Sequence, residues 1–183
     1  MSPERVYPDE PAGPFPTPPR SFADKEERTI ELEPADMDDV DDITAMYLDF
    51  DPADRAQGIP PTGEGRIRDW LDTIVGEGLN ICARHDGRVV GHATLVPDTS
   101  TFETDQVAHE LAIFVLQAYQ RAGIGRQLLE TLLGYGHEEG VERVWLTVER
   151  WNTAAVSLYR DTGFETCGSE SFELEMSLLL DDS

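Results

Sequence analysis

Lysine, cysteine and long apolar runs are scarce in this chain, and each scarcity excludes a class of protein. Lys25 is the one lysine among 14 basic residues, against 37 acidic ones, so no basic stripe is available to bind a nucleic-acid backbone. Cys82 and Cys167 lie far apart in apolar segments, which predicts buried free thiols in a reducing cytoplasm rather than a disulfide framework. No run approaches the roughly 18 apolar residues of a membrane span, and no signal peptide is recognisable. We therefore expect a soluble, cytoplasmic protein without nucleic-acid or membrane partners.

The excess of acidic residues gives a formal net charge of −23. One interpretation is a surface that recruits cationic substrates. The other is adaptation to very high salt, where screening shortens the range of charge repulsion. Because the acidic residues are spread over the whole chain, we prefer the second interpretation, which predicts an origin in a halophilic microbe.

The organisation of the chain predicts a tail followed by one domain. Residues 1–26 are rich in proline and lack apolar periodicity, which is typical of a flexible, acidic tail, and residues 27–183 form the domain. Hydrophobic periodicity predicts helices near residues 36–49, 66–75, 123–139 and 153–161, and strands near 29–32, 79–84, 88–96, 106–116, 144–148 and 172–180. Asp86-Gly87 indicates a tight hairpin turn between two of these strands. The fold class is a mixed α/β or α+β sheet with helices on both faces.

A glycine-rich segment, Gly123-Ile124-Gly125, lies between a predicted strand and a predicted helix. Glycines let the backbone approach a phosphate, and the first N–H groups of a helix point at it with the positive end of the helix dipole. The P-loop string is absent, and Leu128 stands where the dinucleotide fingerprint requires a third glycine. A diphosphate on a carrier such as coenzyme A remains, beside the alternative of a plain structural turn.

Two linked motifs resemble the GNAT superfamily of acyl-CoA-dependent N-acyltransferases. The first motif is a strand ending in Ile113-Phe114-Val115, followed by Gln120-Arg-Ala-Gly-Ile-Gly125. The second motif, N-x-x-A-x-x-x-Y-x-x-x-G-F, is present as Asn152, Ala155, Tyr159, Gly163 and Phe164. The chain departs from many members of the family at Gln117, where they carry proline, and we expect only a mild change in the loop.

The resemblance implies a fold, a cofactor and a set of binding residues. The fold is a mostly antiparallel central sheet with a splayed strand pair, and the splay is expected to come from a β-bulge. The cofactor is acetyl-CoA, whose pyrophosphate meets the backbone amides of residues 121–126 and whose pantetheine arm pairs with Phe114 and Val115. The arginine at the end of this loop has two interpretations, a phosphate contact or a surface charge. The implied binding residues are Ile113, Phe114, Val115, Arg121, Ala122, Gly123, Ile124, Gly125, Arg126 and Asn152.

The reaction implied by the resemblance is direct attack of an amine on the thioester, which calls for a base and an acid. Tyr159 stands where the family has its general acid, although a tyrosine four residues after Ala155 also fits a packed helix face. Glu110 is our candidate base, because it shares a strand face with Ala112 and Phe114. The alternative base is His109, whose neutral imidazole also suits the task. Asn152 is interpreted mainly as a helix cap, with a contact to the cofactor as the second role.

Three functional hypotheses remain open from the sequence. The first is an N-acetyltransferase acting on a primary amine of a small molecule or protein, and the second is a non-catalytic acyl-CoA-binding regulatory module. The third is a structural domain whose glycines only turn the chain. The remaining histidines are too scattered for a metal site, so no metal is expected, and a homodimer formed through edge strands would follow many relatives. The sequence does not identify the acceptor amine.

Overall fold

The computed structural model describes residues 5–50, 60–98, 107–170 and 172–180. Its helices are α1 (Val40–Leu48), α2 (Glu64–Glu77), α3 (Ile124–Glu138) and α4 (Thr153–Thr162). Its strands are β1 (Arg20–Ala23), β2 (Thr29–Pro34), β3 (Leu79–His85), β4 (Arg88–Pro97), β5 (Ala108–Val115), β6 (Arg143–Glu149), β7 (Glu165–Ser169) and β8 (Glu173–Leu179). Within these ranges, none of the helices is both long enough and apolar enough to cross a membrane.

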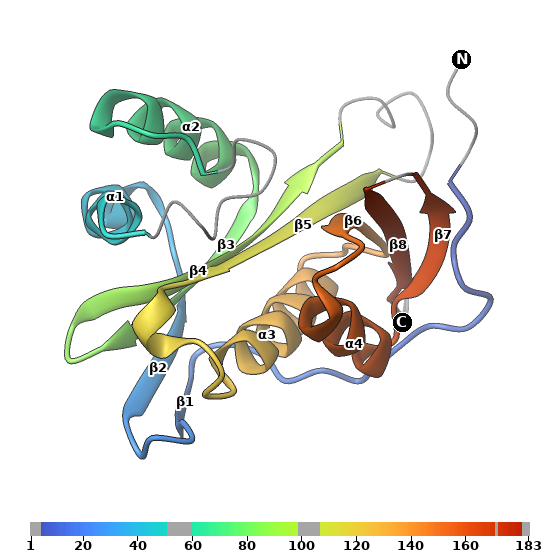
Figure 1. Cartoon of the computed structure of the whole chain (residues 1–183), viewed down its shortest axis with the longest axis horizontal. Coiled ribbons are helices and arrows are strands. Elements are labelled where there is room, and N and C mark those ends of the chain that lie inside the picture. The colour runs from blue at the N-terminus through green and yellow to red at the C-terminus, as the bar shows by residue number, and fades with distance from the viewer. Residues whose placement is uncertain (1–4, 51–59, 99–106, 171, 181–183) are drawn as a thin grey trace.

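The strands form one sheet in the order β1-β2-β3-β4-β5-β6-β8-β7. Neighbouring strands are antiparallel except β5 and β6, which run parallel and are joined by the crossover helix α3. Helices α1 and α2 lie on one face of the sheet, and α3 and α4 lie on the other (Figure 1). The predicted mixed, mostly antiparallel sheet with helices on both faces is confirmed.

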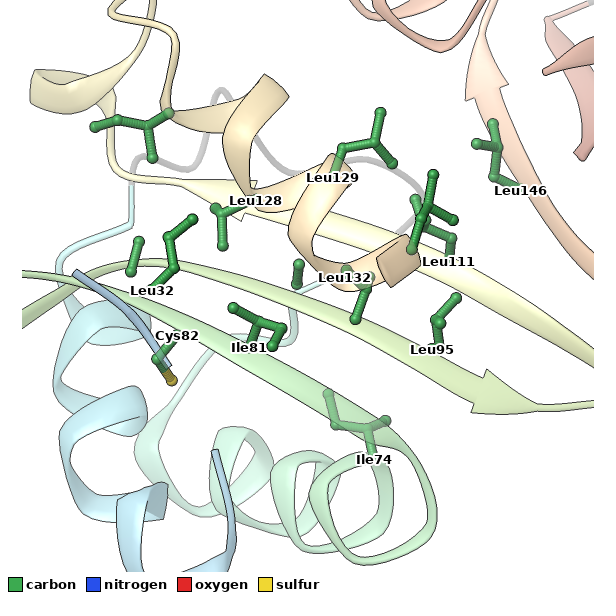
Figure 2. Packing of buried hydrophobic residues seen from close by; sticks show 14 of the residues in the cluster. Leu32, Ile74, Ile81, Cys82, Leu95, Leu111, Leu128, Leu129, Leu132 and Leu146 are labelled. Carbon is green, nitrogen blue, oxygen red and sulfur yellow. The ribbon is translucent and has the colours of Figure 1, made fainter. Parts of the chain in front are cut away.

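Buried residues of α3 meet those of the middle strands in the core. Leu128 and Leu132 of α3 pack against Ile81 of β3 and Leu95 of β4, all buried (Figure 2). Strand β4 is buried on both faces from Val89 to Leu95, which explains why its sequence lacks the alternation of a half-exposed strand.

A glycine in β4 allows the close approach of α3 to the sheet. A Cβ atom built on Gly91 would lie 2.8 Å from Leu128 Cδ1 and 3.3 Å from the Cβ of Ala83. The first distance is shorter than real Cβ contacts and the second is tight, so a side chain at this position would force the Leu128 side chain of α3 to shift. The position of α3 matters because its first turn carries the glycine-rich segment.

The predicted helices and the hairpin agree with the structure, whereas two edge strands escaped prediction. The hairpin turn is formed by Asp86 and Gly87, both with positive φ (51° and 81°), as a type I′ connection requires. Strand β1 lies inside the segment expected to be a tail, so regular structure begins at Arg20 rather than at Thr29. Strand β7 lies in Glu165–Ser169, which lacks alternation. The predicted start of β5 at Gln106 lies outside the described residues.

Residues before β1 also make specific contacts with the rest of the chain. The N–H of Ala12 donates to the carbonyl of Leu179 at 2.8 Å, and Ser177 Oγ donates to the carbonyl of Val6 at 2.7 Å. The segment passes the outer side of β7 and continues below α4 and α3 before it enters β1 (Figure 1). A Cβ on Gly134 of α3 would lie only 1.8 Å from the carbonyl oxygen of Pro16, so the helix and this segment touch closely.

Candidate active site

The parallel strands β5 and β6 part after three residue pairs. They are in register from Ala108/Arg143 to Glu110/Trp145, and no further pair follows in the described part of either strand. Each strand keeps its other partner, since β5 pairs with β4 as far as Val115 and β6 pairs with β8 as far as Glu149. The sheet therefore opens between β5 and β6, which is the splay that the resemblance implied.

We expected the splay to come from a β-bulge, and for the pairing of β4 with β5 this expectation is wrong. Their register runs without a shift from Gly91/Val115 to Pro97/His109. In the described strands, β5 stays paired with β4 and β6 stays paired with β8 beyond the point where the two part. The backbone of Ile113 and Phe114 consequently has a sheet partner on the β4 side only.

The loop that follows β5 presents backbone N–H groups in a row. Arg121 and Gly123 both have positive φ (61° and 90°), and Gly123 caps α3 without a side-chain hydrogen bond. In the described structure, the first backbone N–H after Gln120 that finds a protein acceptor is that of Gln127, which donates to the carbonyl of Gly123 at 3.3 Å. The N–H groups of residues 121–126 are thus available to an anion.

The space over this loop is open, and the loop itself is anchored. A Cβ on Gly125 would meet no protein atom within 4 Å. The side chains of Ala122 and Ile124 are buried, so these two residues can offer only their backbone to a ligand. The carbonyl of Ala122 accepts a hydrogen bond from the N–H of Lys25, and Gln120 Nε2 donates to the carbonyl of Val115, each at 3.0 Å. A diphosphate fits such a row of donors on a fixed loop.

Arg126 lies in the first turn of α3, and its guanidinium approaches Asp161 Oδ2 of α4 at 3.4 Å. Both side chains are largely exposed, and exposed ion pairs of this kind contribute little to stability. The structure therefore gives Arg126 a surface contact, and the cation remains within reach of a ligand at the loop.

The second motif places Asn152 and Tyr159 on α4. Asn152 Oδ1 accepts a hydrogen bond from the N–H of Ala155 at 3.2 Å, which confirms the predicted helix cap. The Tyr159 ring packs edge-on against Phe164, with centroids 5.6 Å apart. Desolvation raises the pKa of Tyr159 to about 12, so its phenol keeps its proton at neutral pH. The ring is a packed aromatic, as one interpretation required, and the protonated phenol is also compatible with an acid.

Glu110 forms the last pair before the strands part, and its side chain is exposed to solvent. Surrounding protein atoms raise the pKa of its carboxyl by desolvation, the charges of Asp98 and Glu175 raise it further, and Arg5 lowers it. A carboxylate with a raised pKa is a stronger base than an ordinary glutamate, which suits it to accept a proton from an ammonium.

His109 faces the opposite side of β5, because side chains alternate along a strand. Desolvation lowers the pKa of its imidazole, and its buried Nδ1 has no hydrogen-bond partner in the described part of the chain. Glu110 and His109 therefore cannot both accept a proton from an amine bound on one face of the sheet. Phe114 lies on the face of Glu110 and contacts Tyr47, with ring centroids 5.6 Å apart.

Two features beside the site were missed by sequence reasoning. One is a buried hydrogen-bonded chain that joins Tyr47, His92 and Asn80 under the aromatic ring of Phe114. The other is Arg5, which reaches the neighbourhood of Glu110 from the amino-terminal segment. Composition assigned that segment to a tail, and no local pattern in it indicated a long-range contact.

Comparisons with known proteins agree with this geometry. The sequence profile of the acetyltransferase (GNAT) family matches residues 40–164. A protein of Mycobacterium tuberculosis named as an uncharacterised N-acetyltransferase is 33% identical over 94 residues, which are 51% of this chain and 57% of that protein. The chain thus spans just over half the length of that relative. The GNAT domain of PAT from S. lividans superposes with a TM-score of 0.74 at 16% identity, over 88% of this chain and 97% of that one.

A further structural neighbour was solved with a ligand. It is a putative acetyltransferase from Salmonella typhimurium with its cofactor acetyl-CoA, which has a TM-score of 0.64 at 21% identity and covers 84% of this chain and 95% of that one. At these identities the two solved structures show the shared fold. The fold is that of the GNAT acetyltransferases. Because the profile covers more than half of its residues, the chain belongs to the acetyltransferase (GNAT) family.

Proposed function

We propose that this protein transfers the acetyl group of acetyl-CoA to a primary amine by direct attack. The observation that supports this most is the parting of β5 and β6 directly beside a loop whose N–H groups find no acceptor among the described residues. The loop donors would hold the diphosphate, and the one-sided backbone of Ile113–Val115 would pair with the extended arm. Together they would direct the thioester toward Glu110, where the opening ends.

The chain's own residues account for the proton transfers. Glu110 accepts a proton from the acceptor ammonium, directly or through water, so that the amine nitrogen can bond to the thioester carbonyl carbon. The carbonyl electrons pass to oxygen and return, and the carbon–sulfur bond breaks. Tyr159 donates its proton to the departing thiolate, the resulting tyrosinate takes up the second proton that leaves the attacking nitrogen, and the products are an amide and free CoA thiol. With its pKa raised to about 12, the phenol is protonated when the sulfur leaves.

The test measures thiol release from acetyl-CoA across a panel of amines. Glu110→Gln and Tyr159→Phe should each lower kcat by about 10²-fold or more, the low end for loss of a positioned proton-transfer group, with little change in acetyl-CoA affinity. Matched controls are Glu138→Gln and Tyr135→Phe, which change an exposed glutamate and a half-buried tyrosine of α3. Near-full turnover in both site variants would remove the assignments, whereas binding without turnover for every amine would indicate a regulatory acyl-CoA-binding module.

The pH profile gives a second readout for Glu110. A base acts only when it is deprotonated, so activity is present above its pKa and is lost as the pH falls through it. Because the pKa of Glu110 is raised, the acidic limb of kcat/KM should lie above that of an ordinary glutamate, and Glu110→Gln should abolish that limb.

The same proposal extends to the setting of the enzyme. We propose that the domain expected at residues 27–183 acts together with strand β1 as one catalytic unit, in a cytoplasm that keeps Cys82 and Cys167 reduced. Both cysteines are free thiols in the structure, and burial raises the pKa of Cys82 to about 12. The strongly acidic composition supports adaptation to high salt, and a homodimer through the sheet edges β1 or β7 follows the habit of the family.

A further inference from the structure

Arg5 holds its guanidinium against the part of the sheet where β5 and β6 begin to separate. Its Cζ atom lies 3.8 Å from the centroid of the Trp145 ring, in a cation–π arrangement. Its Nε donates a hydrogen bond to Glu175 Oε1, and its Nη1 lies 3.8 Å from Asp98 Oδ2. One cation is therefore surrounded by an aromatic face and carboxylates from two separate segments.

This cation lies beside the proposed base. Trp145 is the parallel partner of Glu110, and paired residues of adjacent strands project from the same face of a sheet. Ser177 of β8 is the antiparallel partner of Trp145, so its side chain projects from that face as well. Glu175 lies two residues before Ser177 in β8 and therefore projects from the same face. The positive charge of Arg5 acts to lower the pKa of the Glu110 carboxyl. The guanidinium thus lies next to the Glu110 carboxyl, to which an acceptor amine must give its proton.

The contacts of Arg5 are partly open to solvent, so a competing cation can reach the partners it uses. The side chains of Arg5, Asp98 and Glu175 remain 19%, 17% and 33% exposed. The segment is tethered by Ser177 Oγ, which donates to the carbonyl of Val6, and by Arg143, whose guanidinium lies 5.1 Å from the centroid of the Tyr7 ring. These ion pairs are only partly buried, so solvent screens them and reduces their net contribution.

We propose that Arg5 is an internal substitute for a cationic group of the acceptor, so that the amino-terminal segment is autoinhibitory. The acceptor class is an amine that carries a second cation, a guanidinium or an ammonium, which sits on Trp145 between Asp98 and Glu175 while the reactive amine meets Glu110. Such an acceptor displaces Arg5 when it binds. This inference rests on the proposed function for the role of Glu110, but the cation site can be tested without any transfer reaction.

The experiment titrates the full chain with L-argininamide and follows the indole N–H signal of Trp145 by NMR. The chain has 3 tryptophans, so Trp145→Phe assigns the signal. Arg5→Ala should bind argininamide about tenfold more tightly than the wild type. This factor follows if Arg5 leaves the site free in roughly one wild-type molecule in ten, because the apparent affinity falls by that fraction. Arg5→Gln, which keeps most of the side-chain length, should show the same gain, and Glu175→Gln in the Arg5→Ala background should lose it.

The controls separate a cation site from general effects of charge. Arg88→Ala removes an exposed arginine that pairs with Asp49 far from Trp145, and it should bind argininamide like the wild type. Uncharged norvalinamide should not shift the Trp145 signal in any variant. Equal affinity of argininamide for Arg5→Ala, Arg5→Gln and the wild type would overturn the proposal. That result would leave acetyl transfer untouched, because no acetyl-CoA is present in the titration.

Discussion

Tyr47, His92 and Asn80 show how single residues fix the protonation of a buried group. The Tyr47 hydroxyl donates to His92 Nδ1 at 2.6 Å, and His92 Nε2 donates to Asn80 Oδ1 at 2.8 Å. Asn80 Nδ2 in turn donates to the carbonyl of Ile74 at 3.1 Å. A neutral imidazole completes this chain of bonds, in agreement with the desolvation that lowers the pKa of His92 to about 3. The rings of Tyr47 and Phe114 couple the chain to β5.

Tyr47→Phe should destabilise the protein by about 1–3 kcal/mol, because it leaves a buried acceptor on His92 without its donor while keeping the ring contacts. Urea unfolding at pH 7.5 measures the difference, and Tyr135→Phe on the half-buried face of α3 is the control. The wild type should also lose stability as the pH falls from 6.5 toward 3, at up to ~1.4 kcal/mol per pH unit, because His92 is protonated in the unfolded chain first. A Tyr47→Phe variant as stable as the wild type would contradict this account.

At the same scale, the sequence predicted those features of a residue that depend on its near neighbours along the chain. The tight turn at Asp86-Gly87, the cap at Asn152 and the shared strand face of Glu110 and Phe114 all follow from neighbours within a few positions. Arg5 could not be found in this way. Its partners, Trp145 and Glu175, come close only through the fold of the sheet.

At the scale of elements, the helices were predictable because their apolar stripes face the sheet. The strands β1 and β7 were not predictable, since each is short and lies at an edge of the sheet. Pairing with β2 or β8 stabilises their strand conformation, although their own sequences lack an alternating apolar pattern. The parting of β5 and β6 also depends on the two halves of the sheet, and no feature within either strand predicts where it begins. Resemblance to the family supplied this expectation, and the register of the sheet confirmed it.

Two helical glycines test the packing of the amino-terminal segment on α3. Gly134→Ala should destabilise the protein, because the new Cβ would lie 1.8 Å from the carbonyl oxygen of Pro16 and push the segment away. Gly65→Ala in α2 is the matched control, since no atom lies within 4 Å of its Cβ, and it should stabilise the protein by up to about 1 kcal/mol through helix propensity. Urea unfolding compares the two, and an equal gain from both substitutions would show that the segment does not pack on α3.

At the scale of the whole molecule, charge repulsion is the dominant feature of a chain with a net charge of −23. The Debye length falls from about 10 Å at 0.1 M salt to about 3 Å at 1 M, so added salt should relieve repulsion within the folded state. We predict that Tm rises with KCl and with NaCl alike and that most of the rise occurs below about 1 M. A Tm that stays constant between 0.1 M and 2 M would count against adaptation to salt.

The account as a whole depends on backbone N–H groups of residues 121–126 that bind a diphosphate. Gly125 offers a direct test, since it lies in the first turn of α3, where its N–H has no protein acceptor in the described structure and its Cβ position is open. Proline is tolerated in the first turn of a helix and removes the N–H, whereas alanine keeps it. Gly125→Pro and Gly125→Ala therefore differ chiefly in one donor.

Calorimetry of CoA and of pantetheine, which lacks the diphosphate, against these two variants and the wild type is the decisive measurement. Loss of a hydrogen bond to a charged group should weaken CoA binding to Gly125→Pro by about 1.5–3 kcal/mol, roughly 10- to 150-fold, with Gly125→Ala close to the wild type. Pantetheine should bind all three proteins alike. Equal affinity of CoA for Gly125→Pro and Gly125→Ala would show that the loop does not hold the diphosphate, and the proposed chemistry would lose its foundation.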